Sequence, residues 1–218
     1  MERAERTILR DGLTIGVAVG VIGVSFGVLA ASKGISTAMT CGMSLFVFAG
    51  GSQFVLASAA GTSLATAVAA ALLLNLRLVA YGLSVASVLH GRLPARLASS
   101  YLVVDESTAY ALSRPTPRLS RRGFYTVGIV LFGCWQTGTL VGALAGGAIG
   151  DPKRYGIDTA LPAALLAMLW PQLGSRRARI AAASGSLIAV GLTPALQPGL
   201  PIMLATFGVV LALAVGRP

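Results

Sequence analysis

The chain has 218 residues, of which 55% are hydrophobic and only 11% are charged, whereas soluble domains are about a quarter charged. Its mean hydropathy is +0.80, so the composition excludes an ordinary soluble domain and indicates an all-helical protein with several membrane-spanning segments. The net charge of +10 does not indicate nucleic-acid binding, because the arginines stand in short clusters between apolar segments and few aromatic residues are interspersed with them.

Eight apolar segments are candidates for membrane spans, since a helix needs about 20 apolar residues to cross the hydrocarbon core. They are residues 12–32, 38–60, 63–89, 97–113, 123–149, 158–173, 178–193 and 199–216. The fourth is short and contains Asp105 and Glu106, so it is either a span or a re-entrant or interfacial helix. We therefore expect seven or eight spans in a single transmembrane domain.

The distribution of arginine and lysine favours eight crossings with both termini in the cytoplasm. In that arrangement eleven basic residues lie on the inner side and five on the outer side, as the positive-inside rule requires. The apolar segment that starts at residue 12 is too long for a cleaved signal peptide, so we expect it to remain as the first helix in the inner cell membrane. Residues 114–122 form a basic loop between two halves, 12–113 and 123–216, with a possible twofold internal repeat.

An arginine near the middle of an apolar helix is the most informative feature of the sequence. Residues 64–89 carry Asn75 and Arg77 near their midpoint, which places the guanidinium near the bilayer centre. Such a charge serves either a structural ion pair or a transport path. Asp105 and Glu106 are the only evident counterions, and neighbouring residues of a helix point about 100° apart, so one carboxylate can face Arg77 while the other faces elsewhere. These carboxylates are also the candidates for proton coupling.

Further polar residues lie where helices are expected to be weak or share a face with Arg77. Tyr81 is four residues after Arg77 and lies on the same side of a helix. Gln53 follows a glycine pair and Gln172 follows a proline, and interrupted segments in corresponding halves of a transporter indicate a binding site at the midplane. The predicted substrate-binding residues are Gln53, Asn75, Arg77, Tyr81 and Gln172, and the predicted ion-pair or proton-coupling residues are Asp105 and Glu106.

The sequence carries no enzyme, cofactor or metal signature. It has no His-Glu-x-x-His, no Gly-x-Ser-x-Gly and no phosphate-binding glycine loop, and Cys41 and Cys134 lack a second ligand at metal-site spacing. We expect a transporter without a cofactor. The alternatives are a passive channel or scaffold subunit of a membrane complex and, with least support, an intramembrane enzyme that uses Asp105 and Glu106.

Several short motifs, in order along the chain, resemble one known family. They are Ser25-Phe26-Gly27, Phe48-Ala49-Gly50-Gly51-Ser52-Gln53-Phe54, Asn75-Leu76-Arg77 followed by Tyr81-Gly82, and Asp105-Glu106-Ser107. Together they resemble the AzlC family of branched-chain amino acid exporters, although Leu78 stands where that family often has a histidine. The resemblance implies export of valine, leucine and isoleucine, together with a small hydrophobic membrane protein of the AzlD type as partner. Because no ATP-binding motif is present, coupling to the proton gradient is the simpler expectation.

Overall fold

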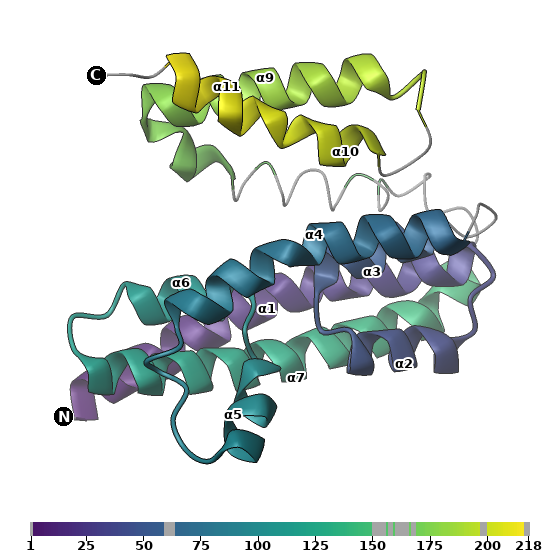
Figure 1. The fold of residues 1–218 in the computed structure, drawn as a ribbon. Coiled ribbons are helices and arrows are strands. Elements are labelled where there is room, and N and C mark those ends of the chain that lie inside the picture. The colour runs from purple at the N-terminus through teal and green to yellow at the C-terminus, as the bar shows by residue number, and fades with distance from the viewer. Residues whose placement is uncertain are drawn as a thin grey trace.

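The computed structural model describes residues 2–58, 64–149, 156, 159, 166, 169–196 and 200–215. Every regular element within these residues is a helix, as the composition predicts. Three helices form a long bundle (Figure 1): α1 (Glu2–Ser32), α4 (Leu64–Ser84) and α7 (Pro117–Ile149). Among the described residues, they contain the three stretches that are long and apolar enough to cross a membrane, Ala4–Ser32, Ala67–Ser84 and Pro117–Gly147.

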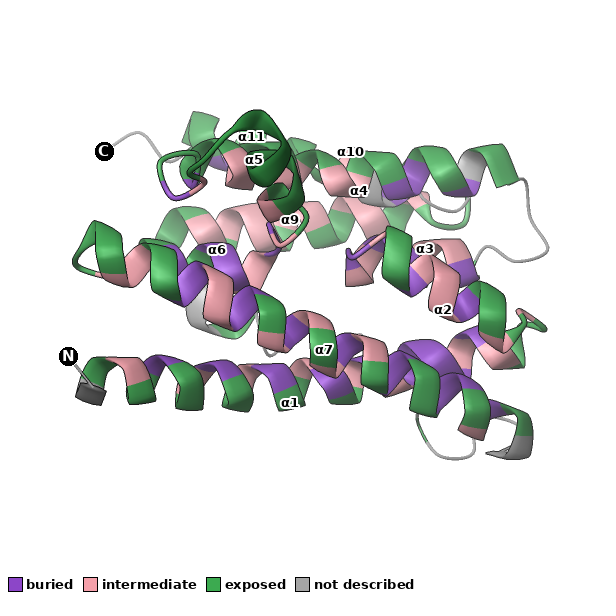
Figure 2. Cartoon of the chain, turned by 90° about the horizontal axis from the view of Figure 1, so that it is seen from below, coloured by how far each residue is buried: buried purple, intermediate pink, exposed green. Residues whose placement is uncertain are grey.

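Helices α1 and α7 are packed along almost their whole length. Gly20 lies against Cys134, and Gly27 lies against the backbone of Thr139, so both helices run in the same direction. Small residues let two backbones approach closely, which is how helices associate where lipid surrounds them. Figure 2 shows buried residues along the sides on which the two helices meet and exposed residues on their outer sides. This pair is the frame on which the other helices are placed.

The predicted span 38–60 is not one helix. It consists of α2 (Thr37–Phe46) and α3 (Gly50–Ser58), which we call the first hairpin. In Figure 1, α2 runs from the end of α1 to the centre of the bundle and α3 runs back to the same end. The prediction of a single helix here is wrong: the helix is interrupted at residues 47–49, just before the two glycines at positions 50 and 51, which weaken a continuous helix.

The predicted span 97–113 is also interrupted. It contains the second half of α5 (Leu93–Ser100) and all of α6 (Asp105–Leu112), and residues 93–112 are called the second hairpin. Ser99 accepts a hydrogen bond from Tyr125 on α7, and α6 runs from the centre back to the end of the bundle where α1 begins (Figure 1). Neither helix is long enough to cross a bilayer, since eight residues span about 12 Å. The structure thus has two short helices here instead of one long one, as a re-entrant or interfacial segment would.

Because the first hairpin returns to the end where it began, it reverses the direction of α4 relative to eight simple crossings. Arg77 lies at the centre of the bundle, where it pairs with Asp105. Val85, farther along the chain, packs with Phe124 near the beginning of α7. Helix α4 therefore runs antiparallel to α1 and α7, and the segment after it lies at the same end as residue 2. The predicted basic loop 114–122 is shorter than expected, because α7 already begins at Pro117.

The C-terminal helices form a smaller layer beside α4 (Figure 1). They are η3 (Trp170–Gly174), α9 (Arg176–Leu192), α10 (Leu200–Ala205) and α11 (Phe207–Val215). The predicted span 178–193 corresponds to α9, and the predicted span 199–216 is divided at Thr206 into α10 and α11. Ser184 on α9 donates a hydrogen bond to the carbonyl of Gly208 at 3.2 Å, and α10 contacts α4. Most of the predicted span 158–173 lies outside the described residues.

Gly142→Ala should destabilise the protein, because its added Cβ would collide with the carbonyl oxygen of Val24 on the facing backbone. Overpacking of this kind costs about 1–3 kcal/mol, so we expect a clear decrease in the melting temperature of the detergent-purified protein. Gly147→Ala on the same helix is the matched control, since no atom lies within 4 Å of its added Cβ. Equal melting temperatures for the two variants would contradict the close contact between α1 and α7.

Single cysteines should distinguish the two topologies. The structure puts the exposed residues Ser32 and Ser87 at opposite ends of the bundle, whereas eight simple crossings would put both on the outer side. In a chain that also carries Cys41→Ala and Cys134→Ala, we expect Ser32→Cys and Ser87→Cys to react with a membrane-impermeant maleimide from opposite sides of oriented vesicles. Reaction of both from the same side would refute the re-entrant hairpins.

Candidate functional site

An ion pair lies at the centre of the bundle. Arg77 Nη2 on α4 is 3.0 Å from Asp105 Oδ2, and the two side chains are 38% and 26% exposed. The outer face of α4 carries Leu76 and Val79, each 61% exposed, so Arg77 lies on the side of the helix that faces the protein. The ion pair expected from the sequence is therefore present, and it joins α4 to α6.

Asp105 is placed at the first residue of α6, where the positive end of the helix dipole stabilises a carboxylate. Ser107 holds the turn before it: its hydroxyl donates to the carbonyl of Leu102 at 2.6 Å and accepts from the N–H of Val104 at 3.2 Å. Glu106 is half-buried, and no ion pair to it is found within the described residues. The two adjacent acids thus differ in their partners, as their helical spacing predicts.

A second positive group, the N-terminus of a helix, lies near the ion pair. The N-terminus of α3 lies beside Arg77, since a Cβ on Gly51 would be 3.6 Å from Arg77 Nη2 and 3.0 Å from Leu74 Cδ2. Free N–H groups and the helix dipole make the first turn of a helix attractive to anions. The guanidinium and the start of α3 are both positive, so a carboxylate that lies between them would be stabilised by both.

Among the described residues, three buried polar atoms have no hydrogen-bond partner: Asn75 Oδ1 and Arg77 Nε on α4, and Thr108 Oγ1 on α6. An unpaired buried polar group costs about 1–3 kcal/mol, so Arg77 Nε, which belongs to the ion pair, indicates that a polar ligand or water completes the site. Asn75 and Arg77 are predicted site residues. Thr108 is not among them, although it is only 3% exposed and its position three residues after Asp105 could have identified it.

Tyr81, also predicted, lies next to the ion pair. Its side chain interacts with the Asp105 carboxylate, and its ring packs against the buried cluster that contains Val85 and Phe124. Tyr81 is four residues after Arg77, and this helical spacing places both side chains at the carboxylate of Asp105, as predicted. This contact adds a hydroxyl group to the polar groups at the centre.

Gln53 is fully buried, and both ends of its amide are occupied. Its Nε2 donates to the carbonyl of Val47 at 2.6 Å, and its Oε1 accepts from Trp135 Nε1 at 3.1 Å. These bonds tie the tip of the first hairpin to α7. Gln172 lies on η3, and its side chain is outside the part of the chain that the structure describes.

The tips of the two hairpins touch each other. The Tyr101 hydroxyl donates to the carbonyl of Leu45 at the end of α2. The rings of Tyr101, Phe48 and Phe132 form a cluster with centroid distances of 5.3–5.8 Å. Sequence reasoning missed Tyr101, because a single tyrosine in an apolar segment has no distinguishing pattern.

Residues 14–149 match the AzlC protein family. The chain belongs to the AzlC family. The matched region runs from α1 to α7 and includes both hairpins, the ion pair and the three unpaired polar atoms, so the site belongs to the part that AzlC proteins share.

A relative with similar length supports the same assignment. The chain is 34% identical over 192 residues to an uncharacterized membrane protein of Archaeoglobus fulgidus, and the alignment covers 84% of each chain. No solved structure matches the chain. The protein is a membrane protein of the AzlC family.

Gln53→Leu should lower stability, because it leaves the Trp135 N–H and the Val47 carbonyl unpaired in a buried place. Each loss costs about 1–3 kcal/mol, and we expect a lower melting temperature in detergent. Gln136→Leu is a graded control, since Gln136 makes one bond, to the carbonyl of Ser44 at 3.0 Å, and should cause a smaller decrease. An unchanged melting temperature for Gln53→Leu would mean that Gln53 does not hold the hairpin.

Proposed function

We propose that this AzlC protein exports branched-chain amino acids, namely valine, leucine and isoleucine, and that the proton gradient drives the export. The observation that carries the proposal is the Arg77–Asp105 ion pair at the start of α3, in which the buried Nε of Arg77 has no hydrogen-bond partner. Helices that are interrupted at the centre of a bundle, with their N-termini directed at an anionic group, are a recurrent substrate site in transporters.

The ion pair offers one group to each charge of an amino acid. The carboxylate of the substrate would bind the planar fork of Arg77 and the first turn of α3, while its ammonium would bind Asp105. Leu74 lies beside Gly51 at this site and supplies an apolar surface for a branched side chain. Gln53 acts here through the hairpin that it holds and not as a ligand.

Competition within the ion pair provides a coupling step. The substrate breaks the ion pair, because its carboxylate binds Arg77 while its ammonium binds Asp105. On the outer side, where protons are more abundant, protonation of Asp105 removes the partner of the ammonium and releases the substrate. On the inner side, Asp105 gives up this proton and pairs with Arg77 again, so each exported substrate is exchanged for one entering proton. Glu106, which has no ion pair in the described part of the chain, is the second candidate for carrying a proton. The contact between Tyr101 and the carbonyl of Leu45 joins the hairpins and would have to break if they move apart.

The proposal includes orientation and a partner. The described arginines at the start of α1, after α4 and at the start of α7 lie at one end of the bundle, and this end would face the cytoplasm of a cell with an inner membrane. The resemblance to the AzlC exporters adds a small AzlD-type membrane protein as partner. No cofactor or catalytic step is part of the proposal.

Arg77→Lys tests the role of the guanidinium, because lysine keeps the charge and loses the planar fork. We expect efflux of preloaded radiolabelled valine from proteoliposomes to decrease roughly tenfold or more, as loss of one charged hydrogen bond of about 1.5–3 kcal/mol implies. Arg179→Lys, on the exposed start of α9, is the matched control and should transport normally.

The same assay separates the alternatives. Efflux is measured with and without the AzlD-type partner and with and without an imposed pH gradient. Asp105→Asn should abolish the dependence on the gradient. Efflux that never depends on the gradient would indicate a passive channel, and the absence of efflux from folded protein with its partner would indicate another substrate or a scaffold role.

A further inference from the structure

A cavity of about 550 Å³ opens at the end of the bundle where α7 begins. It is lined by His90, Pro117, Arg118, Arg121, Arg122, Tyr125 and Thr126, and we call it the basic pocket. Its lining includes neither Arg77 nor Asp105. The proposed transport site therefore does not include it.

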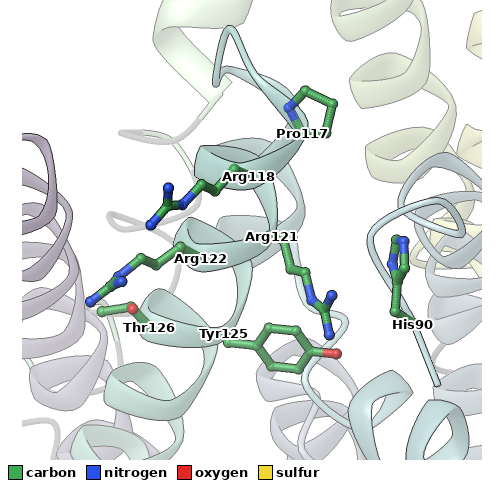
Figure 3. Close-up of a pocket in the computed structure, with 7 residues that line it drawn as sticks. All are labelled: His90, Pro117, Arg118, Arg121, Arg122, Tyr125 and Thr126. Carbon is green, nitrogen blue, oxygen red and sulfur yellow. The ribbon is translucent and has the colours of Figure 1, made fainter. Parts of the chain in front are cut away.

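The arginines of the basic pocket differ in their surroundings. Arg122 Nη1 is bound to Glu5 Oε1 of α1 at 2.7 Å. Arg121, in contrast, forms no ion pair within the described residues. Figure 3 shows its guanidinium beside the Tyr125 side chain, on the side of α7 where His90 lies. Arg121 thus presents its charge to the cavity.

The groups around Arg121 are held in place by the fold. The hydroxyl of Tyr125 donates to Ser99 at 2.9 Å, which fixes α5 against α7. The Nδ1 atom of His90 is 3.0 Å from the carbonyl of Val88, so Nε2 is the remaining polar atom of the ring. A guanidinium and an imidazole on opposite walls form a site for an anion with several oxygen atoms.

The surfaces next to the pocket are apolar. Ile129, one helical turn beyond Tyr125, is 59% exposed, and Leu93 and Leu97 on α5 are 68% and 62% exposed. The pocket itself lies at the end of a stretch that is long and apolar enough to cross a membrane, where lipid headgroups are expected to meet the protein. A ligand with a phosphate group and acyl chains matches both the charge of the pocket and these neighbouring surfaces.

We propose that the basic pocket binds the phosphate group of an anionic phospholipid, with Arg121 as its main ligand. The positive-inside rule accounts for arginines at this end of the bundle but not for their arrangement around a cavity with apolar margins. Basic pockets between helices on the cytoplasmic side are recurrent headgroup sites in membrane proteins. The lipid would bridge α7 and the segment between α4 and α5.

Binding is tested on the full chain in detergent by native mass spectrometry with added phosphatidylglycerol. We expect the wild type to retain phosphatidylglycerol in preference to phosphatidylcholine, and Arg121→Gln to bind it about fivefold more weakly, as one arginine near the lipid surface implies. Arg179→Gln on α9 removes the same charge elsewhere and should bind like the wild type. Melting temperatures of all three proteins without added lipid show that the variants are folded.

Each result decides the proposal. Selective loss of phosphatidylglycerol in Arg121→Gln alone supports it. Equal binding by all three proteins, equal weakening in both variants, or equal retention of phosphatidylcholine would overturn it. Inorganic phosphate is added at millimolar concentration in a separate series. If it displaces phosphatidylglycerol completely, the pocket is a site for soluble phosphate and the lipid proposal is wrong.

Discussion

The structure depends on one constraint: backbone polar groups that end inside a bilayer must find partners within the protein. The first hairpin ends α2 and begins α3 at the centre, and the second begins α6 there. Gln53 donates a hydrogen bond to the carbonyl of Val47, and Tyr101 donates one to the carbonyl of Leu45. The hydroxyl of Ser107 forms hydrogen bonds with backbone groups of the turn before α6. At the start of α3, Arg77 adds a further positive charge. This end of the hairpin therefore attracts an anion more strongly than a helix terminus alone.

The contact between α1 and α7 makes room for this arrangement. The backbones of α1 and α7 come close together at Gly20 and Gly27, so the two helices pack with a short distance between their axes. The hairpins then pack on the sides of this pair, with Trp135 on α7 bonded to the first hairpin. A looser pair of helices would shift Trp135 relative to Gln53 and would leave the tip of the hairpin without support.

The helical class, the family resemblance and the Arg77–Asp105 ion pair could be predicted from the sequence. The pair was predictable because a central arginine needs a counterion and few carboxylates lie in apolar segments. The hairpin within 38–60 was not predicted, and for 97–113 the sequence left a span and a re-entrant or interfacial helix open, since hydropathy measures how apolar a segment is and not whether the chain crosses or returns. Tyr101 was missed because its importance arises from a contact with a segment distant in the sequence.

The ion pair also constrains how the chain enters the membrane during synthesis. Helix α4 carries a central arginine, which costs about 2.5–3.5 kcal/mol when a single helix is inserted. Its counterion on α6 is synthesised later, after α5. Until Asp105 arrives, α4 is a poor lipid-facing helix, and α6 is too short and too acidic to insert by itself. The two segments therefore have to be integrated as one unit, so the charge that is proposed to bind substrate also sets the order of assembly.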